Sequence, residues 1–135
     1  MPKVVTCLLE NNGEILILRR SDDVGTYQEM WGGVAGFVEE NEEPFDTAIK
    51  EIKEEVGLDK DDLFSLKRLD SIRFTDLYRD KLYDWIVYPF LFHINDRDKI
   101  KIDWEHTEFR WIKPSELNNY ETVPRFKEIV IKIFS

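Results

Sequence analysis

The chain has 135 residues, a formal net charge of −9 and a single cysteine. This length suits one domain that buries roughly two thirds of its unfolded surface, and no linker or repeat divides residues 1–135. One cysteine excludes an internal disulfide, and the negative charge argues against a broad binding surface for long nucleic acids.

The chain carries no sequence feature that addresses it to a membrane. The N-terminus lacks the architecture of a signal peptide, and no apolar run reaches the roughly 18 residues needed to cross a bilayer. Cys7 lies within an apolar segment, where a small core residue is the simplest interpretation. We expect a soluble cytoplasmic protein without membrane contacts. Its oligomeric state is left open, and a homodimer is compatible with the sequence.

The N-terminal residues predict a β-hairpin followed by a loop. Residues 3–10 and 14–20 are rich in apolar side chains and are separated by Asn-Asn-Gly, a strong signal for a tight turn. Residues 15–18 are apolar without alternation, which predicts a strand covered on both faces. Residues 21–30 lack periodicity and predict a loop.

A helix is predicted between Pro44 and Gly57. Proline suits the first turn of a helix, and glycine suits the position just past its end. At about 100 degrees per residue, one arc of this helix is apolar and a different side is acidic. The apolar arc holds Phe45, Ile49, Ile52 and Val56 with Ala48 at its edge, and the acidic side holds Glu51, Glu54 and Glu55. We therefore expect one face to pack and the other to present three carboxylates.

The remaining elements are two longer strands, a short strand and a closing helix. Residues 69–75 and 82–94 have the composition of strands, and Pro89 indicates an edge or a bulge in the second one. Residues 109–112 predict another short strand. Apolar side chains repeat at i, i+3, i+4 and i+7 within residues 126–133, which predicts an amphipathic helix. Helices should therefore cover both faces of the sheet.

The acidic side of the first helix is unfavourable without a cation. Spacings of three and four residues bring such carboxylates within about 5–6 Å at Cβ, so they repel each other. An acidic helix face taken alone is most often a solvated surface. Mg²⁺, however, is bound by a few carboxylate oxygens together with water and substrate phosphates. Because such a cation bridges carboxylates and phosphates, a net charge of −9 is compatible with a phosphate-bearing substrate.

The spacing of residues 36–58 favours the metal-binding interpretation. The segment fits the pattern G-x5-E-x7-[RK]-E-U-x-E-E-x-G-U, where U is aliphatic, and a chance match is rarer than roughly one in a hundred thousand. The matching residues are Gly36, Glu42, Lys50, Glu51, Ile52, Glu54, Glu55, Gly57 and Leu58. This pattern resembles the signature box of the Nudix hydrolases. The resemblance implies an α/β/α sandwich with a mixed β-sheet over the whole chain.

The resemblance also implies roles for residues of the box. Glu51, Glu54 and Glu55 would be metal ligands, supported by Glu42 from the preceding loop. Gly36 belongs to the same site, where a glycine lets loop and helix approach each other. The family usually carries arginine where this chain has Lys50. Lysine keeps the charge that organises the carboxylates but loses the planar fork.

Further candidates lie outside the box. Glu105 resembles a later family carboxylate that acts with Glu51, Glu54 and Lys50 in catalysis, and Glu108 is its alternative. His106 lies between them in sequence and is more often a loop histidine than a ligand contact. Candidate substrate contacts are Arg19, Arg20 and Arg73 for phosphate and the aromatic Trp31, Tyr27, Phe74, Tyr78, Tyr83 and Trp85 for a base.

The leading hypothesis is a Mg²⁺-dependent Nudix hydrolase, with Mn²⁺ as a substitute ion. It would cleave a pyrophosphate bond in a nucleoside diphosphate linked to another group, such as a nucleoside triphosphate, a damaged nucleotide, ADP-ribose or a dinucleoside polyphosphate. The first alternative is a nucleotide-sensing domain with weak or no turnover, which the lysine at position 50 allows. An isomerase of isoprenyl diphosphates is less favoured, because the chain lacks that family's cysteine-bearing motif.

Overall fold

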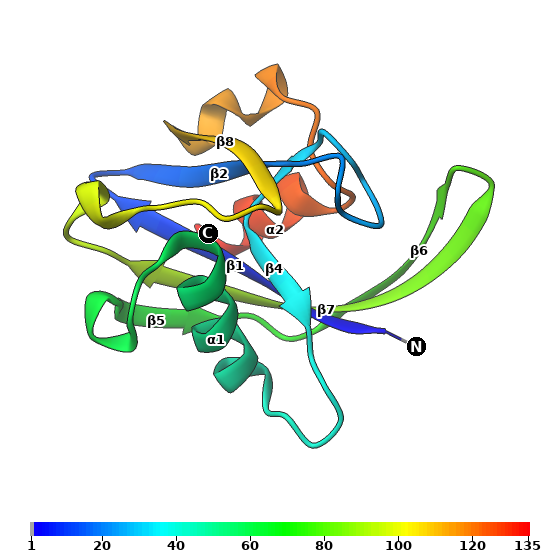
Figure 1. Ribbon diagram of the computed structural model, residues 1–135, viewed down its shortest axis with the longest axis horizontal. Coiled ribbons are helices and arrows are strands. Elements are labelled where there is room, and N and C mark those ends of the chain that lie inside the picture. The colour runs from blue at the N-terminus through cyan, green and yellow to red at the C-terminus, as the bar shows by residue number, and fades with distance from the viewer. Residues whose placement is uncertain (1) are drawn as a thin grey trace.

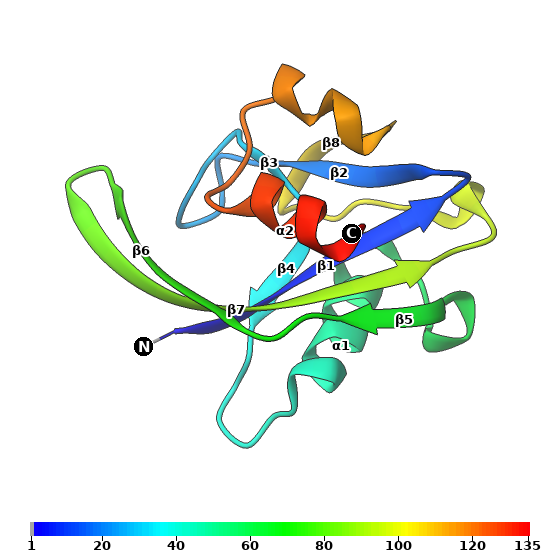
Figure 2. The same ribbon diagram turned by 180° about the vertical axis from the view of Figure 1, so that it is seen from behind.

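The computed structural model describes residues 2–135, in which one twisted sheet lies between two helices (Figures 1 and 2). The strands are β1 (Lys3–Asn11), β2 (Glu14–Arg20), β3 (Trp31–Gly32), β4 (Val34–Phe37), β5 (Phe64–Arg68), β6 (Ile72–Tyr78), β7 (Lys81–His93) and β8 (His106–Ile112). The helices are α1 (Pro44–Val56) and α2 (Phe126–Ile133), with short 3₁₀ turns at Lys60–Asp62, Arg97–Lys99 and Pro114–Asn119. None of these helices is long and apolar enough to traverse a lipid bilayer.

The sheet is mixed, as predicted. β1 pairs with β7 in parallel. The other pairs are antiparallel: β1 with β2 and β4, β2 with β3 and β8, and β7 with β5 and β6. β1 contacts β2 only near the turn, at Glu10 and Asn11. Its earlier residues, from Val4 to Cys7, pair with β4 instead. This divergence of β1 and β2 lets β4 carry its residues to the side of the sheet that faces α1 (Figure 1).

The sheet is covered on both faces, which confirms the predicted sandwich. Leu16 and Leu18 of β2 belong to the apolar cluster that includes α1. Ile15 and Ile17 of the same strand pack in the cluster that includes α2. Successive residues of a strand point to opposite faces, so an uninterrupted apolar run was the correct signal of double burial.

The ends of α1 follow from local sequence. The Glu43 side chain accepts a hydrogen bond from the Phe45 N–H at 2.7 Å, and Pro44 occupies the first turn, where no N–H is needed. Gly57 ends the helix in the left-handed conformation at φ 77°. The predicted boundaries are therefore confirmed. One expectation is corrected: Glu55 does not lie on the exposed side but is buried against the sheet, because it sits at the edge of the packed face.

The sheet differs from the sequence-based expectations at three strands and at Pro89. The short strands β3 and β4 and the exposed strand β5 have no clear alternating pattern and were not predicted. Pro89 lies inside the central strand β7 and not at an edge. Its carbonyl accepts from the Leu69 N–H, so the position of its missing N–H faces the gap between β5 and β6, where no ladder bond is required.

β6 and β7 form a long curved hairpin that projects from the body of the sheet (Figures 1 and 2). Along β6, partly buried residues such as Phe74 alternate with exposed ones such as Arg73. The hairpin is thus half exposed, with one side turned toward the core and the loop of residues 21–30.

Candidate active site

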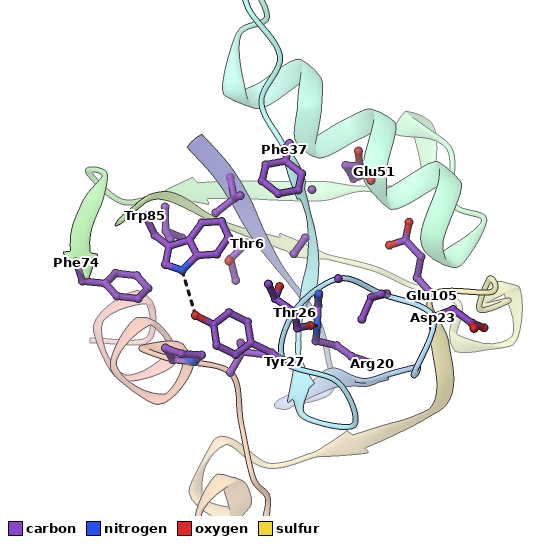
Figure 3. Close-up of a pocket in the computed structure, with 18 of the residues that line it drawn as sticks. Thr6, Arg20, Asp23, Thr26, Tyr27, Phe37, Glu51, Phe74, Trp85 and Glu105 are labelled. Atoms are coloured by element: carbon purple, nitrogen blue, oxygen red, sulfur yellow. Dashed lines mark hydrogen bonds between the residues drawn. The ribbon is translucent and has the colours of Figure 1, made fainter. Parts of the chain in front are cut away.

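A cavity of about 490 Å³ lies among α1, β4, the loop of residues 21–30 and the β6–β7 hairpin. Its two ends differ in chemistry (Figure 3). One end carries the side chains of Asp23, Glu51 and Glu105, and the other carries the rings of Tyr27, Phe37, Phe74 and Trp85, with Arg20 between them. We call these the carboxylate end and the aromatic end.

Gly36 places β4 directly under the carboxylate of Glu51. Pairing of Gly36 with Val5 of β1 fixes the backbone at this point. A Cβ atom built at position 36 would collide with the Glu51 carboxyl group, so any larger residue would displace that carboxylate. The glycine of the box therefore has a steric role that the structure makes explicit.

Glu55 is a buried carboxyl group with an incomplete set of partners. Its side chain is 1% exposed. Oε1 is 3.4 Å from the Ala35 N–H nitrogen and 3.6 Å from Nε2 of His106, whereas Oε2 has no hydrogen-bond partner among the described residues. Burial, with added repulsion from Glu51 and Glu105, holds the pKa of Glu55 well above its usual range.

The neighbouring acids are perturbed in the same direction. Burial is the main cause that raises the pKa of Glu51, and the charge of Glu54 adds to it. Burial also raises the pKa of Glu105, with further contributions from Asp103 and Glu51. Three carboxyl groups in one region are therefore poorly neutralised by the protein itself, which is the electrostatic situation that a bound cation would relieve.

The donor set fits a hard divalent cation that the substrate helps to hold. Among residues 2–135, no three side chains of Asp, Glu, His or Cys converge into a ready-made metal cage. Mg²⁺ typically takes one or two carboxylates and completes its shell with water and substrate phosphates, so a complete cage is not required. The unpartnered Oε2 of Glu55 beside Glu51, with the exposed Glu54 on the same helix, meets this requirement.

Lys50 contacts Glu42 and not the other box carboxylates. Its Nζ lies 3.0 Å from Oε2 of Glu42, while Oε1 of Glu42 accepts from the Thr47 hydroxyl at 2.6 Å and from the Glu39 N–H at 3.2 Å. These bonds, that of Thr47 foremost, lower the pKa of Glu42 to about 2. Glu42 is therefore held as a fixed anion at the entry to α1.

Glu105 and Arg20 are the charged candidates outside the box that reach the cavity, in addition to the aromatic candidates Tyr27, Phe74 and Trp85. The backbone carbonyl of Glu105 accepts from the Ser21 N–H at 2.8 Å, which ties its loop to the residue after Arg20. The Arg20 Nε donates to the Thr26 carbonyl at 3.0 Å, and this bond holds the guanidinium between the two ends of the cavity (Figure 3).

Other predicted candidates lie elsewhere. Glu108 and Arg19 are 3.9 Å apart as an ion pair outside the cavity lining. Trp31 is 7% exposed and packs edge-on against Tyr120 near α2. Arg73 projects from the exposed side of β6, opposite to Phe74. The alternation along β6 could have separated Arg73 from Phe74, whereas the burial of Trp31 depends on contacts distant in sequence.

His106 is a site neighbour whose placement the sequence did not reveal. It is buried, with Nδ1 3.2 Å from Oδ1 of Asp103 and Nε2 facing Glu55. Burial lowers its pKa, against the opposing influence of Asp103. The only signal was its position beside Glu105, which does not distinguish a buried from an exposed histidine.

Comparisons with known proteins identify the family and fold of this chain. The NUDIX domain family profile matches residues 1–133. The chain is 29% identical over 125 residues to the nucleoside triphosphatase NudI of Escherichia fergusonii, covering 87% of this chain and 86% of that protein. In fold it resembles the E. coli dihydroneopterin triphosphate pyrophosphohydrolase (TM-score 0.79, 19% identity, 98% and 94% of the two chains covered). It also resembles a C. elegans Ap4A hydrolase (TM-score 0.72, 20% identity, 98% and 94% covered). The chain belongs to the Nudix hydrolase family.

Proposed function

We propose that this protein is a Mg²⁺-dependent pyrophosphohydrolase of nucleoside triphosphates, built as a single Nudix domain over residues 1–135. The family match and the similarity to a nucleoside triphosphatase support a pyrophosphohydrolase. The observation that carries the finer proposal is the buried, unpartnered Oε2 of Glu55, which lies beside Glu51 in a region of raised carboxyl pKa values.

The box carboxylates would hold the cation. Glu51, Glu54 and Glu55 are the ligand candidates, and Glu42 with Lys50 fixes the loop that leads into the helix. When bound, Mg²⁺ supplies charge neutralisation and Lewis acidity toward the phosphate oxygens. The Gly36 position keeps the Glu51 carboxylate where α1 approaches β4.

The chain's own residues account for the remaining steps. Arg20 lies between the two ends of the cavity and would pair with phosphate oxygens, for which its planar fork is suited. Water attacks a phosphorus atom, and the bond from that phosphorus to the bridging oxygen breaks. The bridging oxygen leaves with the diphosphate, and the proton from water passes to a carboxylate, for which Glu105 is our candidate. A nucleoside triphosphate would give a nucleoside monophosphate and pyrophosphate.

One panel assay tests the proposal. Nucleoside triphosphates, damaged nucleotides, ADP-ribose and a dinucleoside polyphosphate are incubated with the protein and Mg²⁺ or Mn²⁺, and products are identified by mass. We expect monophosphate and pyrophosphate from the triphosphates, dependent on the cation. If nucleotides raise the melting temperature but neither cation yields product, the protein is a nucleotide sensor and the proposal is wrong.

A further inference from the structure

The aromatic end of the cavity has its polar atoms occupied by one another. The Tyr27 hydroxyl donates to Oδ2 of Asp76 at 2.8 Å and accepts from the Trp85 Nε1–H at 3.1 Å (Figure 3). Burial, together with Asp76, raises the pKa of Tyr27 to about 12, so this hydroxyl stays protonated at neutral pH. The indole N–H has only one hydrogen to donate. Neither ring therefore has its donor free for a ligand.

Several contacts hold this arrangement in place. Tyr27 has a left-handed backbone at φ 50°, which is unfavourable for an aromatic residue and persists only when the surroundings fix it. Its ring lies 4.6 Å from that of Tyr78, whose hydroxyl accepts from the Gln28 N–H at 3.3 Å. The loop of residues 21–30 and the β6–β7 hairpin are thus bound into one wall before any ligand arrives.

The rest of this end offers flat or apolar surface and adaptable threonine hydroxyls. Phe37 is 61% exposed and its ring lies 6.2 Å from that of Trp85, so an aromatic face remains open to solvent at the cavity. Val4 and Val87 line the same region. Thr6 on β1 and Thr26 also line the cavity, and a threonine hydroxyl can donate or accept, so it does not select between donors and acceptors on a ligand.

We propose that the aromatic end binds the base of a nucleotide by its ring faces and does not read the hydrogen-bonding edge, so that the protein accepts different bases with similar affinity. The inference rests on the proposed function in one respect, since it takes the ligand to be a nucleotide whose phosphates lie at the carboxylate end. Phe37 is the specificity-determining residue: it selects ligands with a planar ring and does not distinguish one base from another.

Magnitudes distinguish stacking from edge recognition. A pocket built to hydrogen-bond a particular group rejects analogues that lack it by about 10⁴–10⁵-fold. Stacking on an aromatic side chain contributes about 1–3 kcal/mol per base, equivalent to roughly 5- to 150-fold in affinity, and tolerates every base because each has a π-face. An occupied Tyr27 hydroxyl and Trp85 N–H favour stacking at the aromatic end.

The test measures binding separately from turnover. Non-hydrolysable α,β-methylene triphosphate analogues of adenosine, guanosine, cytidine and uridine are titrated by calorimetry with Mg²⁺ present. We expect the four dissociation constants to agree within about tenfold. Phe37→Ala should weaken all four by a similar factor within about 5- to 150-fold. Leu77→Ala is the matched control, because Leu77 is 64% exposed on the hairpin but does not line the cavity, and it should change none of them.

Three results would overturn the inference: a spread beyond about 100-fold among the four bases, a Phe37→Ala effect confined to one base, or absence of binding by all four analogues. Product formation with natural triphosphates is measured separately, and it tests the proposed function. A protein that binds the analogues evenly but releases no pyrophosphate would retain the base-tolerant cavity and lose the enzymatic assignment.

Discussion

The two ends of one cavity treat their polar groups in opposite ways. At the carboxylate end, burial raises the pKa of Glu51 and Glu105, and the neighbouring Glu55, behind the cavity lining, is buried with an unpartnered oxygen. At the aromatic end, the Trp85 N–H donates to the Tyr27 hydroxyl, which in turn donates to Asp76. Unpartnered buried groups are costly, and the proposed cation would complete the one at Glu55. Tyr27 and Trp85, by contrast, have no donor left for a ligand, so these two rings can recognise a ligand only by its shape.

The largest expected effect is that of Glu54→Gln. The exposed carboxylate of Glu54 can turn toward a cation without a structural role of its own, so its removal should spare the fold. We expect kcat with a nucleoside triphosphate to fall at least about 100-fold. Steady-state kinetics gives the rate, and an unchanged melting temperature shows that the fold is intact. Wild-type rates from this variant would remove Glu54 from the site.

Gly36→Ala should separate catalysis from folding. The added methyl group meets the end of the Glu51 side chain, which can move aside, so stability should change little while the carboxylate is displaced. We expect at least about a tenfold loss of kcat, since ligand positioning contributes on this scale.

Gly33→Ala is the matched control for this change. Its Cβ would meet the backbone carbonyl of Cys7, which lies in β1 and cannot move aside. This variant should lose about 1–3 kcal/mol of stability in urea unfolding. The steric account fails if Gly36→Ala unfolds as readily as Gly33→Ala, or if it retains full activity.

Glu55→Gln should stabilise the protein when no divalent cation is present. The amide removes a buried, poorly partnered carboxyl group and keeps its shape, for a gain of about 1 kcal/mol at neutral pH. The same variant should lose the rise in melting temperature that Mg²⁺ gives the wild type. Thermal unfolding with EDTA and with excess Mg²⁺ measures both effects. A variant that is less stable than wild type in EDTA would contradict this account.

The local parts of the fold could be predicted, and the long-range parts could not. Pro44 and Gly57 gave the limits of the box helix because caps are local features. Burial of Glu55 depends on how α1 lies on the sheet, which no helical period encodes. Tyr27 and Trp85 are 58 residues apart, so their hydrogen bond had no signal in the sequence.

The same reasoning applies to the failed assignments of side chains. Arg20 reaches the cavity whereas Arg19 pairs with Glu108, because adjacent residues of β2 point to opposite faces and only the fold determines which face carries the site. Pro89 was predicted to mark an edge or a bulge, because proline has no N–H to donate to a neighbouring strand. Pro89 indeed lies where no N–H donor is required. This position is inside the central strand β7, because the gap between β5 and β6 leaves its nitrogen without a partner.

The smallest expected effect lies outside both ends of the cavity. His93 Nδ1 is 2.8 Å from Oε1 of Glu10, and this bond raises the pKa of His93. A histidine whose pKa is raised in the folded state stabilises the fold at pH values below about 6.5, which is its pKa in the unfolded chain. This contribution is lost as the pH rises through the pKa of the folded state.

His93→Gln should therefore cost a few tenths of a kcal/mol at pH 6 and less at pH 9, because the pair is partly exposed to solvent. Urea unfolding of the two proteins at both pH values provides the comparison, and rates of hydrolysis should not change. A larger cost at pH 9 than at pH 6 would reverse the assigned sign.

The most direct test of whether the box carboxylates bind the cation is a titration with Mn²⁺ that is followed by electron paramagnetic resonance. It compares wild type with a variant that carries both Glu51→Gln and Glu54→Gln, each with an α,β-methylene triphosphate present. We predict that wild type takes up the ion and that the double variant binds it at least about tenfold more weakly. Equal Mn²⁺ binding by two correctly folded proteins would contradict the assignment of these carboxylates as the ligands of the catalytic cation.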